Sequence, residues 1–96
     1  MRLEWSRLAL ADRDEIFDYI EADNPRAAVA VDELIAYHVQ LLAQYPERGR
    51  IGRVEGTREL VIGRTPYLAA YRITHDTVLI LRILHGARQW PEELTD

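Results

Sequence analysis

Half-way along the chain, the spacing of the apolar residues changes from that of a helix to that of a strand. Between Pro25 and Tyr45 apolar residues recur every three or four positions, as on one face of a helix. Later they fall into short runs rich in β-formers, over residues 57–62, 67–74 and 77–85. A chain organised in this way is predicted to pack its helices as one layer against a sheet.

Signals near the start of the chain complete this pattern. Residues 1–5 (MRLEW) alternate apolar and polar side chains, which predicts a short strand. Ser6 and Asn24 are helix-capping residue types, and Pro25 is accepted at a first helical position, so two helices are predicted. We predict one α+β domain over residues 1–96, with the order β-α-α-β-β-β and a helical hairpin packed on one face of a small antiparallel sheet.

The composition excludes several classes of protein. The 96 residues include no cysteine, only three scattered histidines, and no apolar run of the roughly 18 residues that cross a bilayer. Neither a metal nor a cofactor is therefore expected. The acidic first turns do not resemble a signal peptide, so we expect a cytoplasmic protein without membrane contact.

The net charge of −4 conceals an asymmetry between the two halves of the chain. Residues 1–48 hold five arginines against ten acids, whereas residues 49–90 hold seven arginines against three acids. Every basic residue is arginine, whose planar fork suits carboxylates and phosphates. A nucleic-acid binder usually has a strongly basic domain, so direct nucleic-acid binding is not expected, while local contact with an acidic partner is possible.

Three arginines, Arg58, Arg72 and Arg82, fall on three successive predicted strands. Arg72 and Arg82 share the open face of the sheet if the loop between their strands has an odd length, whereas a two-residue loop at 75–76 separates them. They are either solvated surface side chains or a patch that binds a partner's carboxylates in bidentate pairs. We call the first case, with an odd loop, the shared-face register. In it the side of the sheet toward the helices would be formed by Tyr67, Ala69, Tyr71 and Ile73 together with Leu79, Leu81 and Ile83.

Apolar residues near the predicted sheet raise a second possibility of partner contact. Trp90, close to Arg88, is either an aromatic anchor for a partner or a tail residue that folds back on the sheet. Leu60, Ile62 and Leu68 need a cover if one face of the sheet is open. A helix or strand of a partner would supply that cover.

His85 ends the last predicted strand, on the face expected for Leu79, Leu81 and Ile83. A histidine at a strand end more often has one ring nitrogen bound to the backbone than a catalytic role. Arg82 lies three positions earlier, so the two side chains should leave opposite faces and not converge on one phosphate unless a bulge intervenes.

Five fragments together carry a resemblance to a known family. They are "YI" (19–20), "YPERGR" (45–50), "TREL" (57–60), "PYLAAYRI" (66–73) and "ILRILHGARQW" (80–90). In this order and spacing the sequence resembles the RelE/ParE superfamily, bacterial toxins of type II toxin–antitoxin modules, also called plasmid stabilisation proteins. The resemblance covers nearly the whole chain and implies the fold predicted above. Arg13 departs from it, since the family usually has an apolar residue there, and this affects only local packing.

The resemblance implies one of two activities. RelE-like members bind the ribosome and cut mRNA, whereas ParE-like members are linked to poisoning of DNA gyrase without cutting RNA. In both groups an antitoxin wraps the toxin and silences it.

Most residues used by the RelE-like nucleases are replaced in this chain. Cleavage by the 2′-hydroxyl needs a base, an acid and cations around the phosphorus. Leu68 stands where these nucleases have an arginine, Glu59 stands where RelE has a lysine, and no tyrosine follows Tyr71. Arg88 alone matches a catalytic arginine of the family, and Glu59 or His85 could act as the base.

We therefore predict a non-catalytic ParE-like toxin that acts on DNA gyrase by protein contact and forms a hetero-oligomer with a cognate antitoxin of ParD or RelB type. One alternative is a RelE-like mRNA endonuclease that uses Arg88 with His85 or Glu59. Another is a detoxified member that only binds its antitoxin. The residues expected to contact a partner are Arg58, Arg72, Arg82, Arg88, Trp90, Leu60 and Leu68.

Overall fold

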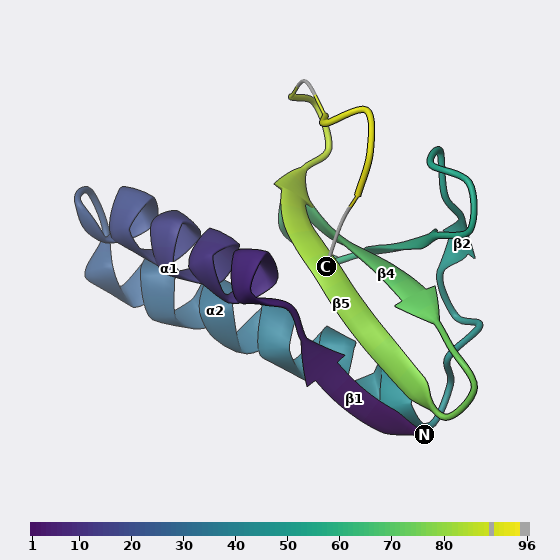
Figure 1. Cartoon of the computed structure of the whole chain (residues 1–96). Helices are drawn as coiled ribbons and strands as arrows, with labels where there is room; N and C mark the ends of the chain where they lie inside the picture. The colour runs from purple at the N-terminus through teal and green to yellow at the C-terminus, as the bar shows by residue number, and fades with distance from the viewer. Residues whose placement is uncertain (89, 95–96) are drawn as a thin grey trace.

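The computed structural model describes residues 1–88 and 90–94, which form a helical hairpin on one face of a five-stranded sheet (Figure 1). The predicted α+β fold is confirmed. Across the sheet the strands lie in the order β1-β5-β4-β3-β2. Along the chain the elements are β1 (Arg2–Trp5), α1 (Arg7–Glu21), α2 (Pro25–Gln40), the 3-10 turn η1 (Leu41–Ala43), β2 (Arg50–Ile51), β3 (Arg58–Val61), β4 (Tyr67–Ile73) and β5 (Thr77–His85).

The sheet is mixed, whereas a fully antiparallel one was predicted. The strand β1 pairs in parallel with the first half of β5, from Arg2 opposite Thr77 to Trp5 opposite Ile80. The loop before β3 contributes the short strand β2, which the sequence pattern did not indicate. The strands β3, β4 and β5 form the expected antiparallel part.

The two helices begin where predicted because their capping side chains bind free backbone groups. Ser6 and Asn24 each accept a hydrogen bond from the N–H three residues later, at 3.0 and 3.1 Å. Arg13 holds the hairpin together through two hydrogen bonds to Asp32 of α2, at 3.0 and 2.8 Å, while its guanidinium stacks 4.8 Å from the ring centre of Trp5. Arg13, where the family usually has an apolar residue, therefore forms an ion pair between the two helices.

The hairpin between β4 and β5 has a two-residue loop. The N–H of Thr74 bonds to the carbonyl of Thr77 at 2.9 Å and leaves His75 and Asp76 at the tip. The shared-face register with an odd loop is therefore wrong. Val78 and Ile80 face the helices with Tyr71, whereas Leu79 and Leu81 lie on the other face.

A bulge in β5 changes the register again. Tyr71 is opposite Ile80, but the next pair is Ala70 with Arg82, so one residue of β5 is unpaired between them. The bulge returns Ile83 to the helix side, as predicted. The main core on this side comprises Ala9, Ile35, Val39, Leu42, Leu60, Ile62, Ala69, Tyr71, Val78, Ile80 and Ile83.

The helix-free face of the sheet is covered by other parts of the chain. Ala70, Leu81 and Leu94 form a second, smaller apolar cluster, so the C-terminal tail returns to the sheet. Val54, Leu79 and Leu84 pack against this cluster. No helix among the residues described is long and apolar enough to cross a membrane.

The expectation that Leu60, Ile62 and Leu68 lack a cover is wrong. Leu60 and Ile62 belong to the helix-side core, and Leu68 is only 4 % exposed. Among the apolar side chains of the strands, the exposed ones are Ile51 on β2, at 75 %, and Val61 at the end of β3, at 53 %.

Candidate functional site

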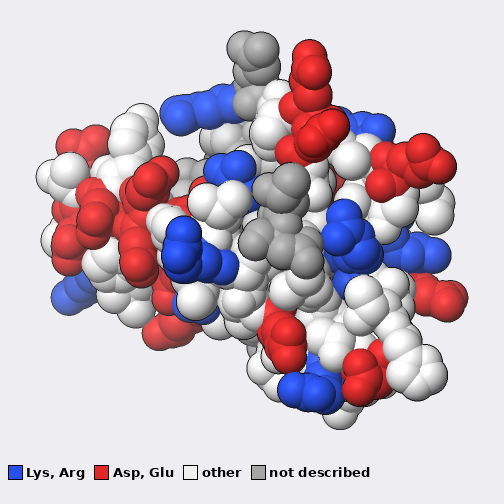
Figure 2. Space-filling model, in the orientation of Figure 1, with Lys and Arg blue, Asp and Glu red and all other residues white. Residues whose placement is uncertain are grey.

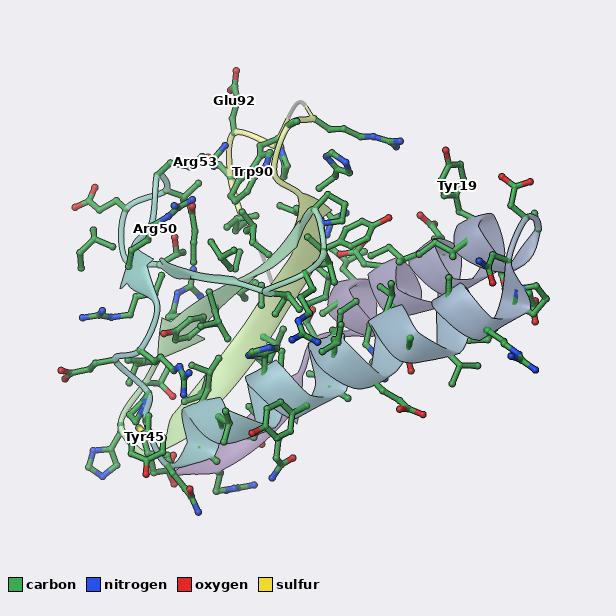
Figure 3. The ribbon with its side chains drawn as sticks, turned by 180° about the vertical axis from the view of Figure 1, so that it is seen from behind. Tyr19, Tyr45, Arg50, Arg53, Trp90 and Glu92 are labelled. Atoms are coloured by element: carbon green, nitrogen blue, oxygen red, sulfur yellow. The ribbon has the colours of Figure 1, made fainter. Side chains whose placement is uncertain are left out.

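A cavity of about 370 Å³ lies between α1 and the end of β5. It forms because β1 stops opposite Ile80, so the rest of β5 has a free edge beside α1. Tyr19 stands exposed on α1 at this end of the molecule (Figure 3). The charged and aromatic residues of the wall are Asp12, Glu15, Tyr19, Tyr67, Arg82, His85 and Arg88.

Arg82 is bound inside this wall by Asp12 of α1. The two side chains form a bidentate pair at 2.7 and 2.9 Å, and Asp12 also accepts the N–H of Ile83 at 2.9 Å. The hydrogen bonds that Arg82 donates to Asp12 raise the pKa of Arg82 and fix its charge. Arg82 is thus turned to the edge of the sheet, and the predicted patch of Arg72 and Arg82 on one open face is wrong.

His85 has the backbone contact that was expected of a strand-end histidine. Its Nδ1 accepts the N–H of Ala87 at 3.1 Å, and its ring meets Tyr67 edge-on with the ring centres 5.6 Å apart. In the neutral imidazole, Nε2 then carries the proton. This nitrogen can donate a hydrogen bond, but it cannot act as a general base in that state.

Arg88 is exposed and lines the same cavity. Among residues 1–88 and 90–94 no acidic partner of Arg88 is found. Arg82 and His85 also reach this cavity, although their spacing predicted opposite directions, because Arg82 turns toward the free edge of β5. The structure thus brings Arg82, His85 and Arg88 together.

Glu59 lies outside the cavity, on the helix-free side of the sheet. It is 3 % exposed and binds Arg50 at 3.1 Å and the backbone and side chain of Arg53 at 2.8 and 3.2 Å. Burial alone would raise the pKa of Glu59, but the hydrogen bonds from Arg53 and Arg50 outweigh it and lower the pKa. A carboxylate held in this way is a weak base, so Glu59 does not complete a site with Arg88 and His85.

Trp90 folds back over the helix-free face, which is the second of its two predicted alternatives. Its ring centre is 3.5 Å from the guanidinium carbon of Arg53, and its indole N–H donates to the carbonyl of His85 at 3.3 Å. Figure 3 shows Arg53, Trp90 and Arg50 on the same side of the sheet. Arg72 lies near this tail, with Nη2 3.5 Å from the carbonyl oxygen of Leu94.

Comparison with protein-family models matches residues 3–90 to the ParE toxin of the type II toxin–antitoxin system parDE. The chain belongs to the ParE toxin family. It is accordingly a type II toxin–antitoxin toxin of the ParE/RelE superfamily, and the resemblance inferred from the sequence is confirmed.

Two relatives of the chain are named as toxins. The chain is 47 % identical over 93 residues to a toxin named Y4kP from Sinorhizobium fredii, covering 97 % of this chain and 96 % of the relative. It is 40 % identical over 84 residues to the toxin RelE2 of Caulobacter vibrioides, covering 88 % and 93 %.

Two solved toxin–antitoxin systems have the same fold. The chromosomal ParDE system from P. aeruginosa matches with a TM-score of 0.80 and 34 % identity, over 86 % of this chain and 92 % of that chain. The RelBE2 complex from Mycobacterium tuberculosis matches with a TM-score of 0.56 and 30 % identity, over 88 % and 95 %.

The family fragment 45–50 has a structural role in this ParE-family chain. The hydroxyl of Tyr71 donates to the carbonyl of Pro46 at 2.7 Å and accepts the N–H of Gly49 at 2.9 Å. A Cβ at Gly49 would lie 2.6 Å from that hydroxyl, so only glycine fits there. Arg58, which stays a predicted partner contact, donates to the carbonyl of Gly49 at 2.7 Å.

Asp12 was not among the residues predicted from the sequence, although its position gave a signal. Asp12 follows Ala9 by three residues and precedes Ile16 by four, so it lies on the apolar face of the first helix. A carboxylate on a buried face calls for a cation or N–H partner. Arg50 and Arg53 gave no comparable signal, because the loop that aims them at Glu59 has no periodic pattern.

Proposed function

We propose that this toxin acts by protein–protein contact, without RNA cleavage, and that its target is DNA gyrase. The observation that carries this proposal is the internal use of its charged residues. Arg82 is paired with Asp12, and Glu59 with Arg50 and Arg53. A phosphoryl-transfer site needs such groups free to meet developing charge.

The position of Leu68 supports the same proposal. In the resemblance to RelE-like nucleases it occupies the place of an arginine, and here it is a buried apolar residue. The net charge of −4 also disfavours binding to the dense phosphates of the ribosome. No metal or cofactor takes part in the proposed mechanism, and the cytoplasm is its proposed location.

The proposed partner in the resting state is a cognate antitoxin of ParD or RelB type. Both structural relatives are toxin–antitoxin systems, which supports a hetero-oligomer of this kind. The proposed contacts include Arg72 and Arg88, which lie at or near the surface. If the toxic action has been lost, antitoxin binding alone would persist.

An mRNA endonuclease is the second candidate, and one observation favours it. Arg88 and His85 line one cavity together with Tyr19 and Tyr67, which could stack on bases. In this case Arg88 would stabilise the charge that develops on the phosphorane, and Nε2 of His85 would donate a hydrogen bond to a phosphate oxygen.

Pulse-labelling after induction without antitoxin separates the two candidates. Incorporation of thymidine into DNA should fall early while incorporation of methionine into protein continues, and purified gyrase should then show trapped DNA cleavage. An immediate fall in methionine incorporation would contradict the gyrase proposal. Arg88→Ala, with Arg64→Ala as a matched exposed arginine, then tests whether the cavity is responsible.

A further inference from the structure

The C-terminal tail occupies the helix-free face of the sheet as a bound peptide would. Leu94 is 5 % exposed and packs with Ala70 and Leu81, although Pro91, Glu92 and Glu93 before it are exposed. One leucine therefore anchors the end of an otherwise solvated segment.

Among residues 90–94, Trp90 and Leu94 contact the helix-free face. Trp90 stacks on Arg53 at 3.5 Å and donates to the carbonyl of His85 at 3.3 Å, and Arg72 approaches the carbonyl of Leu94 at 3.5 Å. The tail forms no strand or helix within the residues described. A segment outside regular secondary structure whose side chains are mostly exposed, as at residues 91–93, opens locally at a small free-energy cost.

The charges of the tail and of the face beneath it are complementary. In the sequence the tail carries three carboxylates after Trp90 and no arginine. On the face, two guanidinium groups, Arg50 and Arg53, share the single carboxylate of Glu59. Their side chains are 58 % and 46 % exposed, so they can meet further carboxylates (Figure 3). Carboxylates are densest over the helical hairpin, and further carboxylates lie among the arginines on the sheet side (Figure 2).

We infer that this face is a binding surface for an acidic peptide segment that carries a large aliphatic side chain, and that the tail is its internal occupant. The partner segment would place its aliphatic side chain on Ala70 and Leu81 and its carboxylates near Arg53 and Arg72. The identification of this partner with the antitoxin rests on the function proposed above. The tail must leave this face before the partner binds. The apparent Kd of the partner is therefore its intrinsic Kd divided by the fraction of molecules in which the tail has left the face.

The test uses the chain's own tail as the probe. A fluorescent peptide with the sequence of residues 89–96 is titrated into the full-length protein and into the full-length double variant Trp90→Ala/Leu94→Ala. The variant should bind the peptide saturably and at least tenfold more tightly than the unaltered protein, because its own tail no longer competes. Adding Arg53→Ala to that variant should weaken binding again.

Equal binding to both proteins, or no binding to the variant, would overturn the inference. Leu8→Ala/Tyr37→Ala is the matched control, since it removes one leucine and one aromatic ring that are 43 % and 61 % exposed on the helices. If the double variant lacks native circular dichroism, Leu94→Ala alone takes its place with the same two outcomes. If the unaltered protein is a dimer and the tail substitutions dissociate it, the tail would bind the second protomer. That result would also contradict the inference that the tail occupies its own chain's surface.

This experiment needs no antitoxin and no toxic effect. Its failure would leave the gyrase proposal untouched, while a failed pulse-label would leave the peptide surface intact.

Discussion

Two buried carboxylates, Asp12 and Glu59, bind arginines at opposite sides of the sheet, but they stabilise different parts of the molecule. Asp12 joins α1 to β5 across 70 residues and also binds the N–H of Ile83 at the free edge of the strand. Glu59 joins Arg50 and Arg53, which are only nine and six residues away, into one loop. The first pair fixes tertiary structure, and the second organises the surface on which the tail lies.

The largest effect is expected from Asp12→Ala. It leaves the guanidinium of Arg82 partly buried without a partner and an edge N–H unsatisfied, at a cost of about 3 kcal/mol in the free energy of unfolding. Chemical denaturation measures this loss. Asp14→Ala, an exposed acid on the same helix, is the control and should stay within about 0.5 kcal/mol of the unaltered protein.

A smaller effect is expected from Glu59→Gln, on the order of 1–2 kcal/mol, because Arg50 and Arg53 are roughly half exposed and regain water. The distinguishing result is local. Fluorescence of Trp90, measured with Trp5→Phe in both proteins, should shift toward that of a water-exposed indole as Arg53 loses its anchor. If Glu59→Gln lowered the free energy of unfolding as much as Asp12→Ala does, the distinction between the two carboxylates would be wrong.

The ion pair between the helices gives a third, weaker point of comparison. Arg13→Met keeps the length of the side chain on Trp5 but removes the pair with Asp32, whose side chain is 33 % exposed. The expected loss in the free energy of unfolding is about 0.5–1 kcal/mol. Arg26→Met, at an exposed site on α2, should change it less than Arg13→Met does.

The smallest expected effect is a pH dependence. Because the folded state lowers the pKa of Glu59, its contribution to stability is present above the ordinary value of 4.5 and is lost as the pH falls through the lowered pKa. The difference in unfolding free energy between the unaltered protein and Glu59→Gln should therefore shrink between pH 5 and pH 2. A difference that stayed constant over this range would mean that hydrogen bonding to Glu59 does not favour its charged form.

Local signals in the sequence were enough to predict the elements of the fold. The caps Ser6 and Asn24, the helical spacing that includes Ile35 and the β-rich runs after residue 57 each act over a few residues. Register is different, because it depends on the length of the 75–76 loop and on the bulge in β5. Neither leaves a mark in the alternation of side chains, so Leu79 and Leu81 were assigned to the wrong face.

The candidate site was harder to predict because its geometry comes from partners distant in sequence. The backbone contact of His85 could be expected from its position at a strand end. The ion pair between Arg82 and Asp12 could have been predicted only from Asp12, because a carboxylate on the apolar face of α1 requires a cationic partner. The return of Trp90 to the sheet was one of two open alternatives, since nothing in the tail sequence states where Leu94 packs.

The central proposal is that Arg82 and Glu59 serve the structure of this toxin and that the chain does not cut RNA. The direct measurement adds the purified protein to ribosomes programmed with a short mRNA and maps the 3′ ends by primer extension. The account predicts intact mRNA at stoichiometric toxin, with Arg88→Ala indistinguishable from the unaltered chain. Cleavage within the A-site codon that is lost in Arg88→Ala would contradict it and make the cavity between α1 and β5 an active site.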